Sequence, residues 1–428
     1  MIHRQVFSRP IRLAAGCAYI CICVAIWTQK LLITLFQCVN INLRTNVRGG
    51  RVLYDILSSR DRQLDDLLTR ICVKLELSDT QRTLAEDRYN AIGKWLGCPE
   101  SNIAKMQPRI YAQGSLRLDT TVKPIRYEEY DLDIVCELTN FTGAEGPVET
   151  LNLIESRLKQ HDTYRAMVER KNRCIRINYA NEFHMDIMPA YPDLSNHDGC
   201  LLVPDRSANS WKPSNPKGFA EWFDRRCLDR IFLEARAKLE PFPDHDDAPR
   251  KPPLKRIVQL MKRYRDIVFQ KEDCGAPISV VLTTLAGQHY SGSYYVNDAM
   301  GQILTGINAN IPASGRLFVF NPAHLAEDFS EKWDDAPLDY ELFKKWIRDF
   351  AKEWKLLRET SGLENIADKL RKMFGETVAN TAIKEQAAAI QNQREKSILR
   401  VATTKNVGLT TITGSGSVAI AKNTFFGE

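Results

Sequence analysis

The sequence predicts a two-lobed α+β protein, with a mixed β-sheet in one lobe and a bundle of helices in the other. Residues 109–138 and 173–190 hold the apolar runs that are typical of strands. From about residue 218 onward, helix-type patterns dominate, and no internal repeat is visible. The length of 428 residues accommodates one large or two ordinary domains.

The composition is that of an ordinary soluble globular protein, with 44% hydrophobic and 26% charged residues. Its formal net charge of +6 does not imply nucleic-acid binding unless the charge gathers on one face. None of the eleven cysteines forms a CxxC pair, and the seven histidines show no zinc-ligand spacing beside them. We therefore expect reduced, buried thiols, as at Cys136 and Cys174, in a cytosolic protein.

Residues 1–51 are predicted to lie outside the natural fold. Residues 13–27 form an apolar run of fifteen, whereas a membrane-spanning helix needs about 20 residues. The longer stretch 13–36 contains Lys30, and no signal-peptide cleavage site is clear. A membrane anchor, a poor signal sequence and translated upstream DNA are the three interpretations. We favour the last, with a non-ATG start at Val52 or Leu53.

The catalytic lobe is predicted to span residues 52–215 and to begin with two helices. The first shows apolar residues at helical spacing: Leu64, Leu67, Leu68, Ile71, Cys72 and Leu75. Ser78 and Gln81 resemble a capping box that opens the second, which Gly97 can end. A further helix is expected at 151–162. The polar break ANE at 180–182, between two apolar runs, predicts a hairpin.

The helical lobe is predicted to span residues 216–400. Its clearest helix begins with two prolines at 252–253 and presents one apolar face: Ile257, Leu260, Met261, Tyr264 and Val268. Residues 401–428 are rich in Thr, Gly, Ser and Asn and predict a flexible tail. The tail contains Phe425 and Phe426, which would dock on the protein's own helical lobe or on a regulatory protein partner.

Two carboxylates, Asp131 and Asp133, lie within the apolar run YDLDIVCEL at 130–138. Residues i and i+2 of a strand point to the same face, so these two carboxylates project together. Burying unpaired carboxylates is costly, so a cation is expected beside them. Mg²⁺ fits, because it prefers oxygen ligands, and an ion pair with Arg or Lys is the structural alternative.

A third carboxylate, Asp186, lies in the second apolar strand FHMDIMPA, with His184 on the same face as an expected hydrogen-bond partner. Together the three aspartates are suited to two metal ions about 4 Å apart, which would activate a hydroxyl and stabilise departing pyrophosphate. Upstream, Gly114 and Ser115 lie at an expected strand end. Glycine permits a close backbone approach, and exposed N–H groups with a serine hydroxyl can bind phosphate oxygens.

The segments QGSLRLDTTVKP, EYDLDIVCEL and HMDIMPA together resemble the nucleotidyltransferase superfamily of DNA polymerase beta type. Within it, the chain is similar to the bacterial cGAS/DncV-like nucleotidyltransferases, or CD-NTases, over about residues 53–428. The segments LKRIVQLMKRYRD, PISVVLTTLAGQHY and NPAHLAEDFSEKW resemble the helical half of that family. The resemblance implies the two-lobed nucleotidyltransferase fold, with the active site between the lobes.

The resemblance also implies roles for individual residues. Asp131, Asp133 and Asp186 would be catalytic and would hold two Mg²⁺ ions, with Mn²⁺ as a second candidate. Nucleoside triphosphates, ATP foremost and GTP or others next, would contact the remaining implied residues: Gln113, Gly114, Ser115, Lys262 and Ser279. The alternative for the basic helix 251–265, which carries Lys262, is a merely solvated face.

The activity implied is repeated nucleotidyl transfer that makes a cyclic di- or trinucleotide second messenger. By resemblance, the enzyme would act in the bacterial cytoplasm in an anti-phage (CBASS) system, where its product binds a downstream effector. One alternative is a template-free transferase that makes linear oligonucleotides, or that modifies an RNA end or a protein. The other is an inactive nucleic-acid sensor, against which the three intact aspartates argue.

Overall fold

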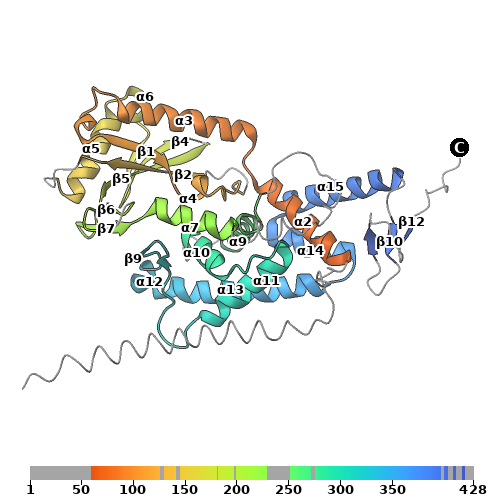
Figure 1. Ribbon diagram of the computed structural model, residues 1–428. Coiled ribbons are helices and arrows are strands. Elements are labelled where there is room, and N and C mark those ends of the chain that lie inside the picture. The colour runs from red at the N-terminus through yellow and green to blue at the C-terminus, as the bar shows by residue number, and fades with distance from the viewer. Residues whose placement is uncertain are drawn as a thin grey trace, which may run out of the picture. The chain divides into compact units, whose positions relative to one another are not determined.

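The computed structural model describes residues 59–125, 130–140, 145–180, 182–196, 199–228, 251–270 and 275–396, together with three short strands nearer the C-terminus (Figure 1). These residues belong to one compact unit, Leu57–Glu428, and the other unit is Met1–Ile56. The predictions for residues 1–51 and for Phe425 and Phe426 therefore lie outside the described residues. Within the part that is described, no helix is long and apolar enough to cross a membrane.

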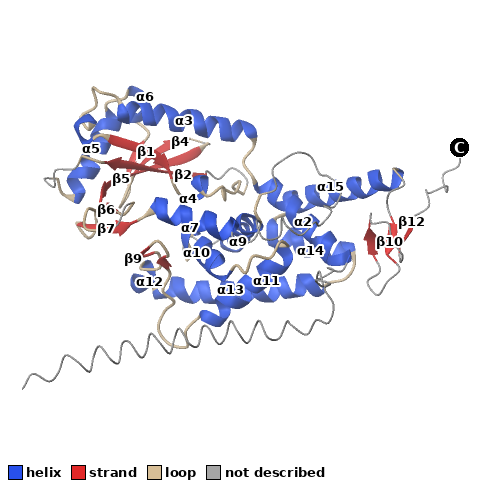
Figure 2. Ribbon diagram, in the orientation of Figure 1, coloured by secondary structure: helices blue, strands red, loops and turns tan. Residues whose placement is uncertain are grey.

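The described part of the catalytic lobe contains a seven-stranded mixed sheet (Figure 2). Its strands are β1 Pro108–Ala112, β2 Tyr130–Leu138, β3 Val168–Arg170, β4 Ile175–Tyr179, β5 Phe183–Pro192, β6 Leu201–Asp205 and β7 Ser210–Ser214. The order is β1-β2-β5-β4-β3, and β6 pairs with both β5 and β7. β2 and β5 run parallel and the other pairs are antiparallel, so the prediction of a mixed sheet is confirmed.

Helices cover one face of this sheet. The helical elements of the lobe are α3 Asp79–Gly97, η1 Ala104–Met106, α4 Gly114–Arg117, α5 Pro147–Lys159 and α6 Asp162–Arg165. Apolar residues of α3 and α5 pack in one core with Leu132 of β2 and Met185 of β5. Since successive strand residues point to opposite faces, Asp131, Asp133 and Asp186 point away from that core. The alternation Asp–Leu–Asp thus places Leu132 in the core and the two aspartates on the opposite face of β2.

The helical lobe has its own core. Its elements are α7 Pro216–Leu228, α9 Pro253–Phe269, α10 Ser279–His289, α11 Val296–Asn310, β8 Phe320–Asn321, β9 His324–Asp328, α12 Lys332–Asp335, α13 Pro337–Glu359, α14 Leu363–Phe374 and α15 Glu376–Glu395. The first helix of the described chain, α2 Ser59–Leu75, also buries its leucines there, among α9, α11 and α15. Although α2 lies within the range predicted for the catalytic lobe, 52–215, its apolar residues pack in the helical core.

Several local predictions are confirmed and others are corrected. The capping box of Ser78 is present, and β4 and β5 form the hairpin predicted around residues 180–182. The stretch 109–138 is not one strand region, because α4 interrupts it after β1. Val268 is 45% exposed, so it does not belong to the buried face of α9. Cys136 is a buried free cysteine as expected, whereas Cys174 is only partly buried.

The predicted tail is not wholly irregular. Three short strands lie in and just before it: β10 Arg400–Ala402, β11 Gly408–Thr410 and β12 Ser417–Ala419. They form a small antiparallel sheet in the order β11-β10-β12. The flexibility predicted for residues 401–428 stays a prediction.

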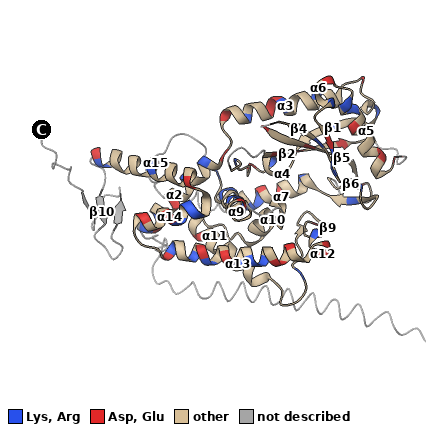
Figure 3. Ribbon diagram, turned by 180° about the vertical axis from the view of Figure 1, so that it is seen from behind, with Lys and Arg blue, Asp and Glu red and all other residues tan. Residues whose placement is uncertain are grey.

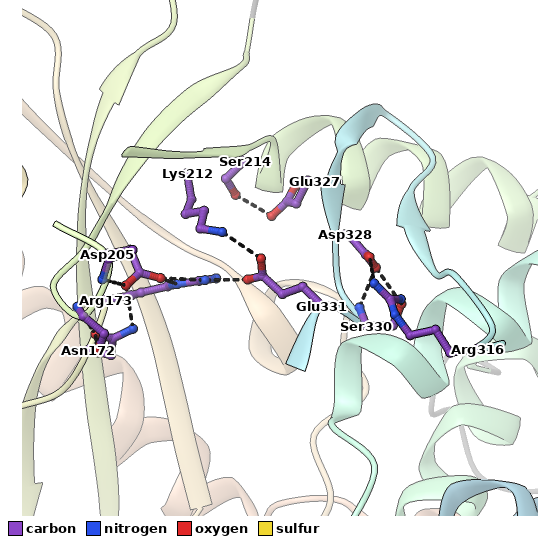
Figure 4. A network of polar contacts seen from close by, with 12 residues as sticks. Asn172, Arg173, Asp205, Lys212, Ser214, Arg316, Glu327, Asp328, Ser330 and Glu331 are labelled. Carbon is purple, nitrogen blue, oxygen red and sulfur yellow. Dashed lines mark hydrogen bonds and ion pairs between the residues drawn. The ribbon is translucent and has the colours of Figure 1, made fainter. Parts of the chain in front are cut away.

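Polar contacts join the two lobes at one edge of the sheet (Figure 4). Glu331, just before α12, accepts hydrogen bonds from Arg173 and from Lys212 of β7, the latter at 2.9 Å. Glu327 of β9 accepts from the Ser214 hydroxyl at 2.8 Å and from the Asn215 N–H at 3.0 Å. These contacts tie the β8–β9 hairpin of the helical lobe to the end of the sheet.

Candidate active site

The three predicted aspartates meet on two neighbouring strands. In the parallel pairing of β2 with β5, Asp133 is opposite Asp186, and Asp131 is opposite His184. Neighbouring strands lie about 4.8 Å apart, so Asp133 and Asp186 project side by side. The Asp131 side chain is 58% exposed and that of Asp186 is 17% exposed. The cluster therefore opens to solvent at Asp131.

An arginine that the sequence analysis did not single out completes this cluster. Arg176 lies on β4, opposite Asp186 in the β4–β5 hairpin. Its Nε and Nη2 donate to the two carboxylate oxygens of Asp186 at 2.7 and 2.8 Å, and Nη2 also contacts Asp131 Oδ1 at 3.1 Å. The predicted turn could have identified Arg176, because a hairpin centred on residue 181 pairs residue 176 with residue 186.

Burial, together with the negative charges of Asp131 and Asp186, raises the pKa of the Asp133 carboxyl to about 7. Although the Asp131 side chain is partly exposed, desolvation by its surroundings raises the pKa of this carboxyl, and the charge of Arg176 opposes the rise. Three carboxylates at this spacing are therefore not fully compensated by the nearby cations. Additional positive charge at this site would stabilise the carboxylates.

Gly114 packs closely against Asp133, so that any larger residue would force a shift there. Its φ is +59°, in the left-handed region that favours glycine, and a Cβ atom built there would lie 2.1 Å from Asp133 Oδ2. The preceding N–H, that of Gln113, donates to the Asp133 carbonyl oxygen at 2.9 Å. Gly114 and Ser115 begin α4, where N–H groups lack intrahelical acceptors. The turn thus presents backbone donors beside the carboxylates.

Lys262 reaches the same region from α9 of the helical lobe. The residue is 4% exposed, and its Nζ donates to the Thr120 carbonyl at 3.1 Å and to the Thr120 hydroxyl at 3.2 Å. Burial and the positive charge of Arg265 lower the pKa of Lys262 to about 7, although the negative charge of Asp133 opposes this change. Lys262 is therefore not part of a solvated face, which excludes the alternative interpretation at this position.

Ser279 is held by Arg265, a second arginine that the sequence analysis missed. Ser279 is the first residue of α10, and its hydroxyl accepts a hydrogen bond from Arg265 Nη1 at 3.0 Å. Arg265 also donates to Asp266 Oδ1, at 2.7 and 2.9 Å. Three residues after Lys262 on α9, Arg265 was recognisable only as part of the basic helix.

The three aspartates, the Gly114–Ser115 turn and the Lys262, Arg265 and Ser279 side chains of the helical lobe line one cavity of about 520 Å³. The eight predicted site residues are among its walls: Gln113, Gly114, Ser115, Asp131, Asp133, Asp186, Lys262 and Ser279. The helical lobe adds Arg265, Glu327 and two aromatic rings, those of Phe219 and Phe329. Cavities of this size accommodate ligands as large as a nucleotide. Its walls come from both lobes, as the family resemblance implied.

The donor chemistry of the carboxylate cluster fits a divalent metal ion. As the side chains stand, no group of three or more His, Cys, Asp or Glu residues among those described is arranged to hold a metal. Arg176 occupies carboxylate oxygens of Asp131 and Asp186 instead. The three carboxylates nevertheless supply the oxygen ligands that Mg²⁺ prefers, on adjacent strands of one sheet.

The mixed sheet with a helical lobe, and the aspartate pair on a strand beside a Gly-Ser turn, define the class of nucleotidyltransferases. Residues 62–226 match the family model described as the Second Messenger Oligonucleotide or Dinucleotide Synthetase domain. A c-di-GMP synthase of Roseivirga ehrenbergii is 30% identical over 383 residues, which cover 87% of this chain and 100% of that protein. The chain belongs to this family of second messenger nucleotide synthetases.

Two further comparisons agree with this assignment. The cyclic dinucleotide synthase CdnG of Bradyrhizobium diazoefficiens is 27% identical over 348 residues, covering 75% of this chain and 82% of that one. The structure of that CD-NTase in complex with GTP has a TM-score of 0.62 and 24% identity, over 76% of this chain and 98% of the other. At this identity the structural likeness supports the fold, and the α+β two-lobed prediction is confirmed.

Proposed function

We propose that the protein joins two molecules of GTP into a cyclic dinucleotide and releases two molecules of pyrophosphate. The observation that carries this proposal is the position of Asp131, Asp133 and Asp186. They lie on one face of β2 and β5, in the wall of a cavity that also contains the Gly114–Ser115 turn and Lys262. In each step a ribose hydroxyl attacks an α-phosphorus, a new P–O bond forms, and the bond to pyrophosphate breaks.

Each residue has a role that follows from its chemistry. The backbone N–H groups and hydroxyl at Gly114–Ser115 would bind phosphate oxygens of the donor nucleotide. Lys262, on the opposite lobe, would add positive charge to the triphosphate, and Ser279 with Arg265 would extend that contact. Phe219 and Phe329 supply apolar surface on which a base can pack.

Asp131, Asp133 and Asp186 would hold the divalent metal. When bound, Mg²⁺ supplies the Lewis-acid charge that favours ionisation of the attacking hydroxyl and departure of pyrophosphate. The chain's contribution is the geometry: β2 and β5 fix the three carboxylates, and Gly114 holds the phosphate-binding turn against Asp133. Mn²⁺ is the alternative ion, since it accepts the same oxygen ligands.

GTP replaces ATP as the first candidate substrate because of the relatives. One is described as a c-di-GMP synthase, and another was solved in complex with GTP. A cyclic dinucleotide is the corresponding product, in preference to a trinucleotide. A role for that product in anti-phage signalling, through a separate effector, is the further part of this proposal and follows from the family resemblance.

The two alternatives make different demands. A nucleic-acid sensor would need a concentrated basic surface. Along α13, Lys and Arg residues are interleaved with Asp and Glu (Figure 3). A linear oligonucleotide synthase would use the same aspartates, so only its product distinguishes it.

The test is to incubate the full chain with Mg²⁺ and each nucleoside triphosphate alone or all four together, treat the products with phosphatase, and analyse them by mass spectrometry. We expect GTP alone to yield a phosphatase-resistant product with the mass of cyclic diguanylate. A product that phosphatase shortens would establish the linear alternative. Asp133→Asn is the negative control, and Asp162→Asn, at a 97% exposed side chain, is its matched control.

A further inference from the structure

Arg176 contacts the carboxylate cluster from β4, a strand that carries none of the predicted metal ligands. Its guanidinium makes a two-pronged contact with Asp186 and a third contact with Asp131. The side chain is only 19% exposed, and its neighbours Ile175 and Ile177 are fully buried, so β4 holds its backbone firmly. Planar guanidinium–carboxylate pairs of this kind are strong and directional.

The oxygens that Arg176 occupies are those that a metal ion would need. Of the four carboxylate oxygens on Asp131 and Asp186, three accept a hydrogen bond from the guanidinium. The carboxylate of Asp133 is instead adjacent to Gly114, where a Cβ atom would lie 2.1 Å from its Oδ2. A divalent cation and the guanidinium therefore compete for the same atoms, while Asp133 stays available to the metal.

We propose that Arg176 is the counter-ion of the metal-free site, which holds Asp131 and Asp186 in place and is displaced when a divalent cation binds. This inference rests on the metal-binding role proposed above for the aspartates. Without such a partner, three converging carboxylates would repel one another and splay. With it, the strands keep the geometry of the site, and the metal must exchange for an existing cation. Arg176 is in this sense a positioning residue.

Displacement has a measurable consequence for metal affinity. Breaking charge-assisted hydrogen bonds opposes metal binding, so removal of the guanidinium should tighten it. In Arg176→Gln, we expect the affinity for Mn²⁺ alone, without nucleotide, to rise by roughly tenfold. Arg176→Lys keeps one charge but lacks the planar fork, so its affinity should lie between wild type and Arg176→Gln.

The experiment is an Mn²⁺ titration of the full chain without nucleotide, followed by electron paramagnetic resonance of the free ion. Thermal unfolding in EDTA and in Mn²⁺ is measured alongside. Arg176→Gln should have a lower Tm than wild type in EDTA and a larger gain in Tm on adding Mn²⁺. Arg173→Gln is the matched control, because Arg173 forms ion pairs with Asp205 and Glu331 and not with the proposed metal ligands. It should lower Tm without changing Mn²⁺ affinity.

Unchanged or weaker Mn²⁺ binding in both Arg176 variants would overturn the inference. That result is expected if the guanidinium stays in place when the metal binds. The proposed function is judged separately by Asp133→Asn in the same titration. Loss of Mn²⁺ binding in Asp133→Asn, together with unchanged affinity in the Arg176 variants, refutes only the displacement. Binding that survives in Asp133→Asn refutes the metal site and the displacement together.

Discussion

Asp133 on β2 and Asp186 on β5 are direct partners across two parallel strands, although 53 positions separate their numbers in the chain. Parallel pairing requires a long crossover, and residues 139–182, with α5, α6, β3 and β4, provide it. The crossover also delivers Arg176 to the opposite side of Asp186. One topological feature thus assembles the carboxylates and their counter-ion.

Asp133→Asn should abolish product formation while leaving the fold intact. The substitution removes a proposed metal ligand but also removes a charge that burial and two neighbouring aspartates destabilise. In EDTA we expect the free energy of unfolding to stay the same or to rise by about 1 kcal/mol. Product yield by mass spectrometry and unfolding in urea are the measurements. Near wild-type synthesis by this variant would remove Asp133 from the proposed mechanism.

Gly114→Ala should lose activity because the turn cannot keep its position. The added Cβ would meet Asp133 Oδ2 at 2.1 Å, and the positive φ is strained for alanine. We expect a loss of stability of about 1–2 kcal/mol from the backbone conformation. Gly97→Ala is the matched control, since its Cβ would meet nothing within 4 Å. An active, equally stable Gly114→Ala protein would show that the close approach is not required.

Lys262→Met should raise the KM for GTP more than it lowers kcat. A lysine that reaches the triphosphate binds the ground state and the transition state to a similar extent, so its loss mainly weakens binding. Methionine keeps the apolar stem, and the Nζ atom is already buried, so the fold should tolerate the change. Steady-state kinetics on Lys255→Met, seven residues earlier on α9, provide the comparison. An unchanged KM would assign Lys262 to the contact with Thr120 alone.

Asp65→Asn should flatten the pH dependence of stability. Burial raises the pKa of the Asp65 carboxyl to about 6, and its Oδ1 accepts the N–H of Asn297 in the first turn of α11 at 2.9 Å. The native state therefore holds this proton more tightly than the unfolded state, so the contribution of Asp65 to wild-type stability falls as pH rises from about 4 to about 6. Asparagine keeps the acceptor without the charge.

The contribution of Asp65 to that fall is at most about 3 kcal/mol, the equivalent of two pKa units. Urea unfolding of wild type and Asp65→Asn at pH 4, 5, 6 and 7 measures it. The two proteins should have similar stability at pH 4, diverge between pH 4 and 6, and differ by the full amount above pH 6, with the variant more stable. Parallel curves across this range would mean that Asp65 does not titrate as described.

Much of the site could be predicted because the residues that form it are recognisable from their spacing over a few positions of the sequence. The i, i+2 aspartates share a face in any strand, and the turn at 180–182 defines the hairpin that carries Asp186. Arg265 could not be separated from its basic neighbours, because a helix pattern does not say which charged residue turns inward. That depends on which helices pack beside α9.

By itself, the sequence determined the two kinds of lobe, the strand face that carries the aspartates and the glycine turn before them, because each depends on residues a few positions apart. Only the tertiary structure decided that α2 joins the helical core, that Lys262 is buried against Thr120 and that Arg176 bridges Asp131 and Asp186. Those facts depend on contacts between segments distant in the chain. Spacing along the sequence does not specify which buried faces meet.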